Sequence, residues 1–192
     1  MADHKENRKS EDRESIAEDP EARARQVCLR LLTFAPRTRA QLAEALRKRG
    51  IPDEVAENVL GRYTDVGLID DAAFARAWVE SRHHSRGLAG RALSAELKQR
   101  GVAAEEIRAA IAAQLGPDAE VSAARGLVER KLAGTRRLPP DQRTRRLAGM
   151  LARKGYPAGL AFRVIREALE AEGSDAALGE EPPFDYHDPD TE

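Results

Sequence analysis

The sequence is poor in the residues that build disulfide scaffolds, metal centres and membrane spans. One cysteine, Cys28, in 192 residues excludes a disulfide framework and a zinc site built on several cysteines. The longest apolar runs are a few residues, whereas a transmembrane helix needs about 20. The N-terminal residues have no apolar core of a secretory signal peptide. We therefore expect a soluble, cytoplasmic protein that does not associate with membranes.

Aromatic and β-branched residues are also scarce, which argues against a sheet. Aromatic residues make up 4% of the chain, whereas 34 of the 192 residues are alanine. Alanine is the best helix former, and β-branched and aromatic residues are the ones that strands favour. The composition therefore predicts an all-α protein.

The net charge of −1 conceals an uneven distribution along the chain. Residues 1–20 carry 4 basic and 7 acidic side chains, and residues 173–192 carry 7 acidic side chains and no basic ones. The central residues 21–172 carry 28 basic and 19 acidic side chains. We expect both ends to be disordered acidic extensions. A basic body favours an anionic partner, either nucleic acid or an acidic protein surface, although ordinary solvated helix faces explain part of the charge.

An internal repeat fills the central region. Residues 42–60, 93–111 and 147–165 align without gaps, and each segment carries two leucines four residues apart, then a basic residue and a glycine. Leucines at this spacing form one apolar stripe on a short helix, and glycine is the residue that most readily ends a helix. The aligned positions are Leu42, Leu93 and Leu147, then Leu46, Leu97 and Leu151, then Gly50, Gly101 and Gly155.

Each aligned segment reads as two helices, and a third helix precedes it. Thr38 and Gln41 have the spacing of a capping box, and Asp70 or Asp71 can cap the next long helix. We therefore predict about nine helices in three tandem three-helix repeats, at residues 21–68, 69–115 and 116–172. Units this small bury their faces only by stacking on neighbours, so we expect an elongated, curved body.

Catalytic and cofactor-binding motifs are missing. The sequence has no phosphate-binding loop, dinucleotide fingerprint, zinc-protease motif or nucleophile elbow. His83 and His84 are adjacent, so a helix would point them about 100° apart. Cys28 lies in an apolar stretch without a histidine to activate it, which favours a core thiol. Phe74 and Trp78 are four residues apart; we predict core packing, with base stacking as the less favoured alternative. We expect no enzyme activity, metal or cofactor.

Arginine outnumbers lysine 26 to 6, and its guanidinium suits bidentate contact with phosphate or carboxylate. Two clusters lie between the first and second helices of the second and third repeats. They are candidate contacts with a filament or with DNA on charge alone, and a solvated helix face is the alternative. The candidates are Arg82, Arg86 and Arg91, then Arg136, Arg137, Arg143, Arg145 and Arg146.

The string VGLIDDAAFARAWVESR at residues 66–82, followed by a glycine and LKQRGV at residues 97–102, resembles the RecX family of regulators of the RecA recombinase. The matching pattern is a Gly-Leu-Ile-Asp-Asp turn, a Phe-Ala pair, a further aromatic, an arginine and a leucine-containing helix that ends at glycine. The resemblance covers residues 21–172. The residues that carry it are Gly67, Leu68, Ile69, Asp70, Asp71, Phe74, Ala75, Trp78, Arg82, Leu93, Leu97 and Gly101.

The resemblance implies three tandem three-helix repeats in a protein that binds the RecA filament on single-stranded DNA. It implies inhibition of ATP hydrolysis, strand exchange and co-protease activity, in recombination and the SOS response, by a protein that is not an enzyme. We expect this protein to be a monomer. DNA would be contacted directly or through the filament. Two alternatives stay open: a helix-turn-helix DNA-binding regulator, and a helical-repeat adaptor for another protein.

Overall fold

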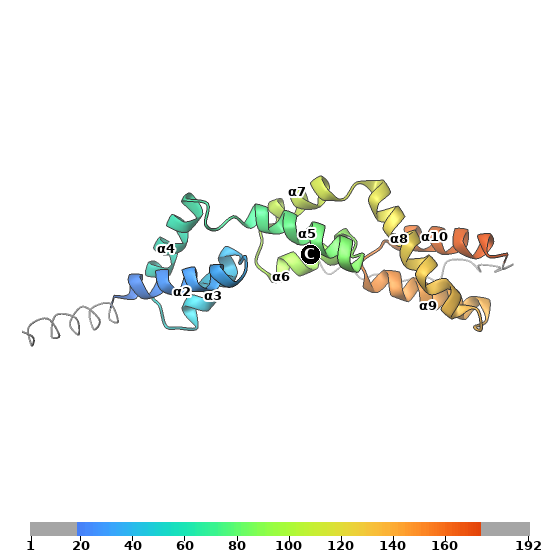
Figure 1. The fold of residues 1–192 in the computed structure, drawn as a ribbon, viewed down its shortest axis with the longest axis horizontal. Coiled ribbons are helices and arrows are strands. Elements are labelled where there is room, and N and C mark those ends of the chain that lie inside the picture. The colour runs from blue at the N-terminus through green and yellow to red at the C-terminus, as the bar shows by residue number, and fades with distance from the viewer. Residues whose placement is uncertain (1–18, 174–192) are drawn as a thin grey trace, which may run out of the picture. The chain divides into compact units, whose positions relative to one another are not determined.

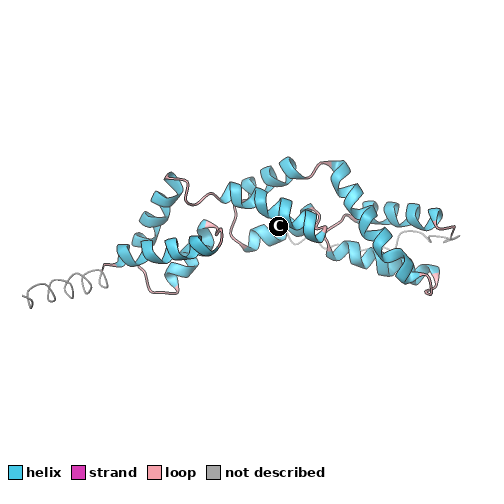
Figure 2. Ribbon diagram, in the orientation of Figure 1, coloured by secondary structure: helices cyan, strands magenta, loops and turns pink. Residues whose placement is uncertain are grey.

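The computed structural model describes residues 19–173, and these residues form nine α-helices and one short 3-10 turn, with no strand among them (Figures 1 and 2). The predicted all-α class is therefore confirmed. The helices are α2 (Pro20–Phe34), α3 (Arg39–Arg47), α4 (Asp53–Asp65), α5 (Asp71–Arg86), α6 (Gly90–Gln99), α7 (Ala104–Gln114), α8 (Pro117–Leu132), α9 (Pro140–Arg153) and α10 (Ala158–Ala171), and the 3-10 turn is η1 (Ala133–Thr135). We call α2–α4, α5–α7 and α8–α10 repeats 1, 2 and 3.

The acidic extensions predicted at residues 1–20 and 173–192 lie outside the described residues except at their inner edges. There, α2 begins at Pro20, and the Asp19 side chain caps it by accepting a hydrogen bond of 2.9 Å from the Glu21 N–H. The described chain divides into two compact units. Unit 1 contains residues 19–86 and 93–115, and unit 2 contains residues 87–92 and 116–173. The elongated shape and the domain boundaries stay predictions.

The predicted helix starts are present. The Gln41 N–H donates to Thr38 Oγ1, and the Thr38 N–H donates to Gln41 Oε1, each at 3.2 Å, so the capping box of α3 is confirmed. Asp70 caps α5 by accepting from the Ala73 N–H at 2.7 Å. Asp71 has a different role, because its Oδ1 accepts from the backbone N–H of Arg39 at 2.9 Å. This second bond ties the first turn of α5 to the first turn of α3.

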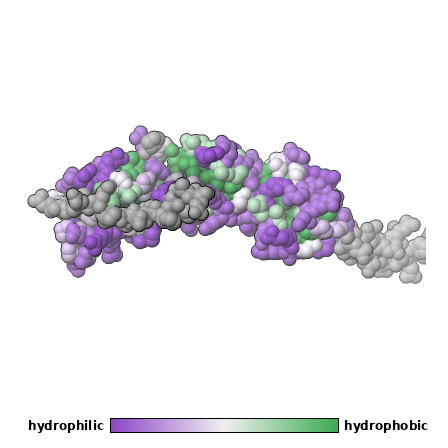
Figure 3. Space-filling model, turned by 180° about the vertical axis from the view of Figure 1, so that it is seen from behind, coloured by the Kyte–Doolittle hydropathy of each residue, from purple (hydrophilic) through white to green (hydrophobic). Residues whose placement is uncertain are grey.

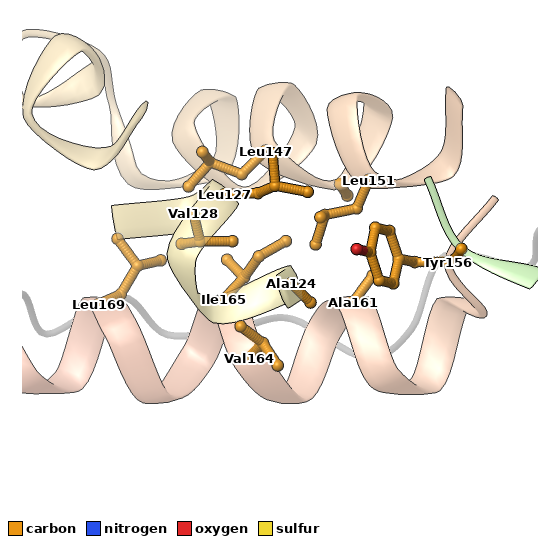
Figure 4. Packing of buried hydrophobic residues seen from close by; sticks show 12 residues of the cluster. Ala124, Leu127, Val128, Leu147, Leu151, Tyr156, Ala161, Val164, Ile165 and Leu169 are labelled. Atoms are coloured by element: carbon orange, nitrogen blue, oxygen red, sulfur yellow. The ribbon is translucent and has the colours of Figure 1, made fainter. Parts of the chain in front are cut away.

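The repeated leucines form the cores. Leu42 and Leu46 in unit 1 and Leu147 and Leu151 in unit 2 are at most 1% exposed. Figure 4 shows the unit 2 core, in which Leu147 and Leu151 of α9 lie over Ile165 and other apolar side chains of α10, with α8 between them. The spacing of leucines in the sequence therefore predicted which helix faces pack inward.

Neighbouring repeats contact one another where the second helix of one repeat begins and the second helix of the next repeat ends; we call this contact the joint. In unit 1, the Thr38 hydroxyl at the start of α3 donates at 2.6 Å to the Arg100 carbonyl, just past the end of α6. Gly101 follows with φ +77°, and an added Cβ there would lie 2.2 Å from the Cβ of Ala40. The start of the second helix of repeat 1 thus packs against the end of the second helix of repeat 2.

Unit 2 contains the same joint. The Ala89 N–H donates to the Lys154 carbonyl, and the Gly90 N–H donates to Glu120 Oε1, both at 2.8 Å. In the repeat alignment, Ala89 and Gly90 correspond to Thr38 and Arg39, and Lys154 corresponds to Arg100. In both units the N–H of the first residue of the second helix therefore donates to a carboxylate in the first turn of the following repeat. The contact to the carbonyl comes from the Thr38 hydroxyl in unit 1 and from the Ala89 backbone N–H in unit 2.

Trp78 does not lie where the sequence predicted. Ala75 and Val79 of α5 are fully buried, whereas Trp78 and Phe74 lie beside this stripe and stay partly exposed. The prediction that Trp78 packs in the core is therefore wrong. An i, i+4 pair of aromatic residues marks one side of a helix, but the adjacent pair Ala75 and Val79 takes the inward side here.

Candidate interaction surface

Helix α9 separates its arginines into an inward and an outward group. Leu147, Ala148 and Leu151 are buried, and so is Arg143. At about 100° per residue, the opposite side of the helix carries Arg145, Arg146 and Arg153, and all three are exposed. Gly149 lies among them with no side chain of its own. The only acidic residue of α9, Asp141, is in its first turn. The outward face of α9 is therefore a continuous basic surface, which we call the α9 basic face (Arg145, Arg146 and Arg153).

Arg143 is a structural residue. The residue is 6% exposed, its Nε donates to Thr135 Oγ1 at 3.2 Å, and its guanidinium pairs with the Glu172 carboxylate. Arg136 pairs with the same carboxylate through its Nε at 2.6 Å, although its side chain remains exposed. The sequence-based choice of Arg143 as a contact residue is corrected accordingly, because a buried guanidinium that already holds a carboxylate offers no surface to a partner. The pair instead fixes the end of α10 to the start of α9.

The Glu172 cluster makes stability depend on pH. Hydrogen bonds from Arg143 and Arg136 lower the pKa of the Glu172 carboxyl from its ordinary value of 4.5. A carboxyl with a lowered folded-state pKa stabilises the fold above its ordinary pKa, and this contribution is lost as the pH falls through the lowered value. We expect the midpoint temperature of thermal unfolding to decrease as the pH is lowered from about 5 to about 3. The decrease should be smaller in Glu172→Gln. Circular dichroism melts with Glu170→Gln on the same helix as control measure this. Equal pH dependence in wild type and Glu172→Gln would contradict it.

The remaining predicted arginines are distributed over both units. In unit 1, Arg86 is exposed near the end of α5, and Arg82 is partly buried with its guanidinium over the Trp78 ring. In unit 2, Arg91 of α6 and Arg137 before α9 are exposed. The structure therefore brings only Arg145 and Arg146 of the predicted set together on one helix face.

Arg153 belongs to the α9 basic face but was missed by the sequence reasoning. It lies seven residues after Arg146, which is about two helical turns, so the helical period places them on one side. The clusters were chosen by closeness in sequence, and that criterion excluded it. Gly149, one turn before Arg153, has the Arg153 guanidinium 3.5 Å from the position of an added Cβ.

Sites for other chemistry are not found in the part of the chain that the structure describes. Among residues 19–173, no three His, Cys, Asp or Glu side chains gather at metal-binding distance, and no helix is long and apolar enough to cross a membrane. Burial raises the pKa of the Cys28 thiol, which keeps it protonated and unsuited to nucleophilic attack. Hydrophilic residues dominate the surface seen in Figure 3, with smaller apolar areas between them.

Three domain models of one family match the chain in order. The models described as the first, second and third three-helix domains of RecX match residues 24–62, 70–111 and 118–165. Curated relatives are similar over most of the chain. Regulatory protein RecX of Thermobifida fusca is 64% identical over 156 residues, which cover 81% of this chain and 84% of the relative. The protein of the same name from Streptomyces coelicolor is 62% identical over 164 residues, covering 85% and 87%.

Two solved structures have a similar fold. A crystal structure of regulatory protein RecX aligns with a TM-score of 0.70 at 23% identity and covers 82% of this chain and 77% of that chain. RecX from Lactobacillus salivarius aligns with a TM-score of 0.71 at 17% identity and covers 78% and 96%. At these identities the likeness shows the fold alone, and it agrees with three three-helix repeats.

Proposed function

Because the chain belongs to the RecX family of regulatory proteins, we propose that it binds the RecA–single-stranded DNA filament and inhibits ATP hydrolysis, strand exchange and co-protease activity there. Family membership is the observation that carries the proposal. Relatives more than 60% identical over most of their length are named regulatory proteins. The residues described add a fold of repeated helices and a basic helix face, and both suit an extended, negatively charged partner.

The α9 basic face is the proposed contact in unit 2, together with exposed Arg137 and Arg136 near the start of the same helix. Arg86 and Arg91 are additional proposed contacts, whereas Arg143 is excluded by its burial. Several weak contacts on one chain act together, since each bound site raises the effective concentration of the next. Contacts that span neighbouring recombinase subunits would hold them at one spacing and oppose the movements that accompany ATP turnover.

Co-sedimentation with recombinase filaments tests this proposal. RecA recombinase is assembled on a long single strand with a slowly hydrolysed ATP analogue, and the full-length protein is added. We expect it to pellet with the filament and to pellet much less with recombinase alone or with DNA alone. Pelleting on DNA alone, with a footprint on one defined duplex sequence, would replace the proposal with a helix-turn-helix DNA regulator. Absence from every pellet would favour an adaptor for a different protein.

A further inference from the structure

Trp78, the only tryptophan of the chain, is at the centre of an array of stacked flat groups in unit 1. The ring of Phe74, one turn earlier on α5, stacks on it with centroids 5.7 Å apart and an interplanar angle of 15°. The guanidinium of Arg82, one turn later, lies 4.2 Å from the Trp78 ring centroid. The guanidinium of Arg100, just past α6, lies 3.8 Å from it. Helix α5 and the residue that follows α6 therefore bring two cations onto one indole.

A hydrogen bond and an ion pair position the ring and Arg82. The indole N–H of Trp78 donates to Glu96 Oε2 at 2.8 Å, and the Arg82 Nε lies 3.9 Å from the same carboxylate. The backbone of Arg100 is fixed separately, because its carbonyl accepts from the hydroxyl of Thr38. The ring and the Arg82 guanidinium thus have set orientations, and the backbone of Arg100 has a set position, before any partner arrives, which lowers the entropy cost of binding.

The array is basic and open to solvent. The array contains two guanidiniums and one carboxylate, that of Glu96, so these groups together carry a net charge of +1. Trp78 and Arg100 are partly exposed, and the side chain of Arg82 is 27% exposed. A guanidinium stacked on a ring keeps its N–H edges for an anion and its outer face for another flat group.

We propose that Trp78, Arg82 and Arg100 form a contact site for single-stranded nucleic acid, in which an unpaired base stacks on the array and a neighbouring phosphate accepts from the guanidinium edges. Unpaired bases stack on aromatic rings and on arginine planes, and arginine adds a cation–π contribution. An acidic peptide would use the N–H edges alone and leave the flat faces without a partner. The site goes beyond the proposed function, because it would bind single-stranded nucleic acid in the absence of the recombinase.

Intrinsic fluorescence tests the site, since Trp78 is the only tryptophan to report. The full-length protein is titrated with a thymidine oligonucleotide of about 20 nucleotides and, separately, with an abasic strand of equal length and charge. This length exceeds the ~4–16 nucleotides that one single-strand-binding fold covers. No recombinase is present. We expect the thymidine strand to change the Trp78 emission and to bind about tenfold more tightly than the abasic strand. Equal affinities for the two strands would overturn the proposal, because the phosphates alone would then account for binding.

Lysine substitutions separate stacking from charge. Arg82→Lys and Arg100→Lys keep the positive charge and remove the flat guanidinium, so the advantage of the thymidine strand should disappear while abasic binding stays the same. Arg76→Lys, at an exposed position on the same helix, is the matched control and should behave as wild type. Circular dichroism melts show whether each variant is folded.

The remaining outcomes are also decisive. A folded Arg82→Lys or Arg100→Lys variant that keeps the full preference for bases would overturn the site. Emission changes of equal size with a polyglutamate peptide would assign the array to an acidic protein partner instead. Neither result bears on co-sedimentation with recombinase filaments, so failure of this site and failure of the proposed function are distinguished.

Discussion

Replacing Gly101 with alanine is expected to lower the free energy of unfolding of unit 1 by about 3 kcal/mol. Two effects add. Gly101 has φ +77°, a conformation that costs a residue with a Cβ about 1–2 kcal/mol. The new Cβ would also lie 2.2 Å from the Cβ of Ala40 on α3, so one of the two backbones must move, and overpacking of this kind costs about 1–3 kcal/mol.

The repeat provides a matched control for this prediction. Gly50 occupies the same position in repeat 1, with φ +70°, but an added Cβ there meets nothing within 4 Å, and no earlier repeat among the described residues packs on it. Gly50→Ala should therefore cost only the conformational part, about 1–2 kcal/mol. Urea unfolding followed by the fluorescence of Trp78, which lies in unit 1, measures both variants.

A second substitution separates the clash from the backbone strain. Ala40→Gly removes the methyl group that the new Cβ would meet, at a cost of about 1 kcal/mol for glycine in a helix. In the double variant Ala40→Gly with Gly101→Ala, the combined loss should be smaller than the sum of the single losses by about 1–3 kcal/mol. Strictly additive losses, or equal losses for Gly50→Ala and Gly101→Ala, would contradict the joint between repeats 1 and 2.

Neutralising the α9 basic face is expected to weaken binding to the recombinase–DNA filament by about two orders of magnitude. The variant replaces Arg145, Arg146 and Arg153 with glutamine, which keeps the helix and removes three exposed charges. If each arginine contacts one phosphate of a single strand, the slope of log affinity against log salt should fall by about 2. Filament binding is measured by fluorescence anisotropy at several salt concentrations.

The control for this variant makes the same charge change elsewhere. Arg47, Arg62 and Arg108 are exposed arginines in unit 1, and each already pairs with a carboxylate, on Glu44, Glu21 and Glu105. Their replacement by glutamine should reduce affinity severalfold at most, because exposed pairs contribute little and long-range charge is screened by salt. Equal losses in the two triple variants would show that net charge, and not the α9 basic face, governs binding.

The repeat pattern predicted the core because leucine spacing depends on local helix geometry alone. Leu42, Leu93 and Leu147 are all buried, and the glycines that follow each pair end their helices with positive φ as expected. The capping pair Thr38 and Gln41 was also predictable, since it lies within one helical turn.

Features that depend on contacts between distant segments could not be predicted in this way. The burial of Arg143 follows from Glu172, 29 residues later, which no local pattern connects to it. Trp78 was assigned to the core because the sequence does not reveal that Ala75 and Val79 take the inward side of α5. Arg153 was missed because the arginine clusters were chosen by closeness in sequence, whereas the helical period decides which arginines share one face of α9.

The most direct test of the central claim is single-stranded-DNA-dependent ATP hydrolysis by RecA recombinase, measured while the full-length protein is titrated from well below equimolar amounts. A regulator that binds along the filament or blocks its growing end should inhibit hydrolysis at less than one molecule per recombinase monomer. Inhibition should also be weaker in the Arg145, Arg146 and Arg153 variant. Unchanged hydrolysis at equimolar protein, with the protein shown to be folded by circular dichroism, would contradict the proposed control of the recombinase.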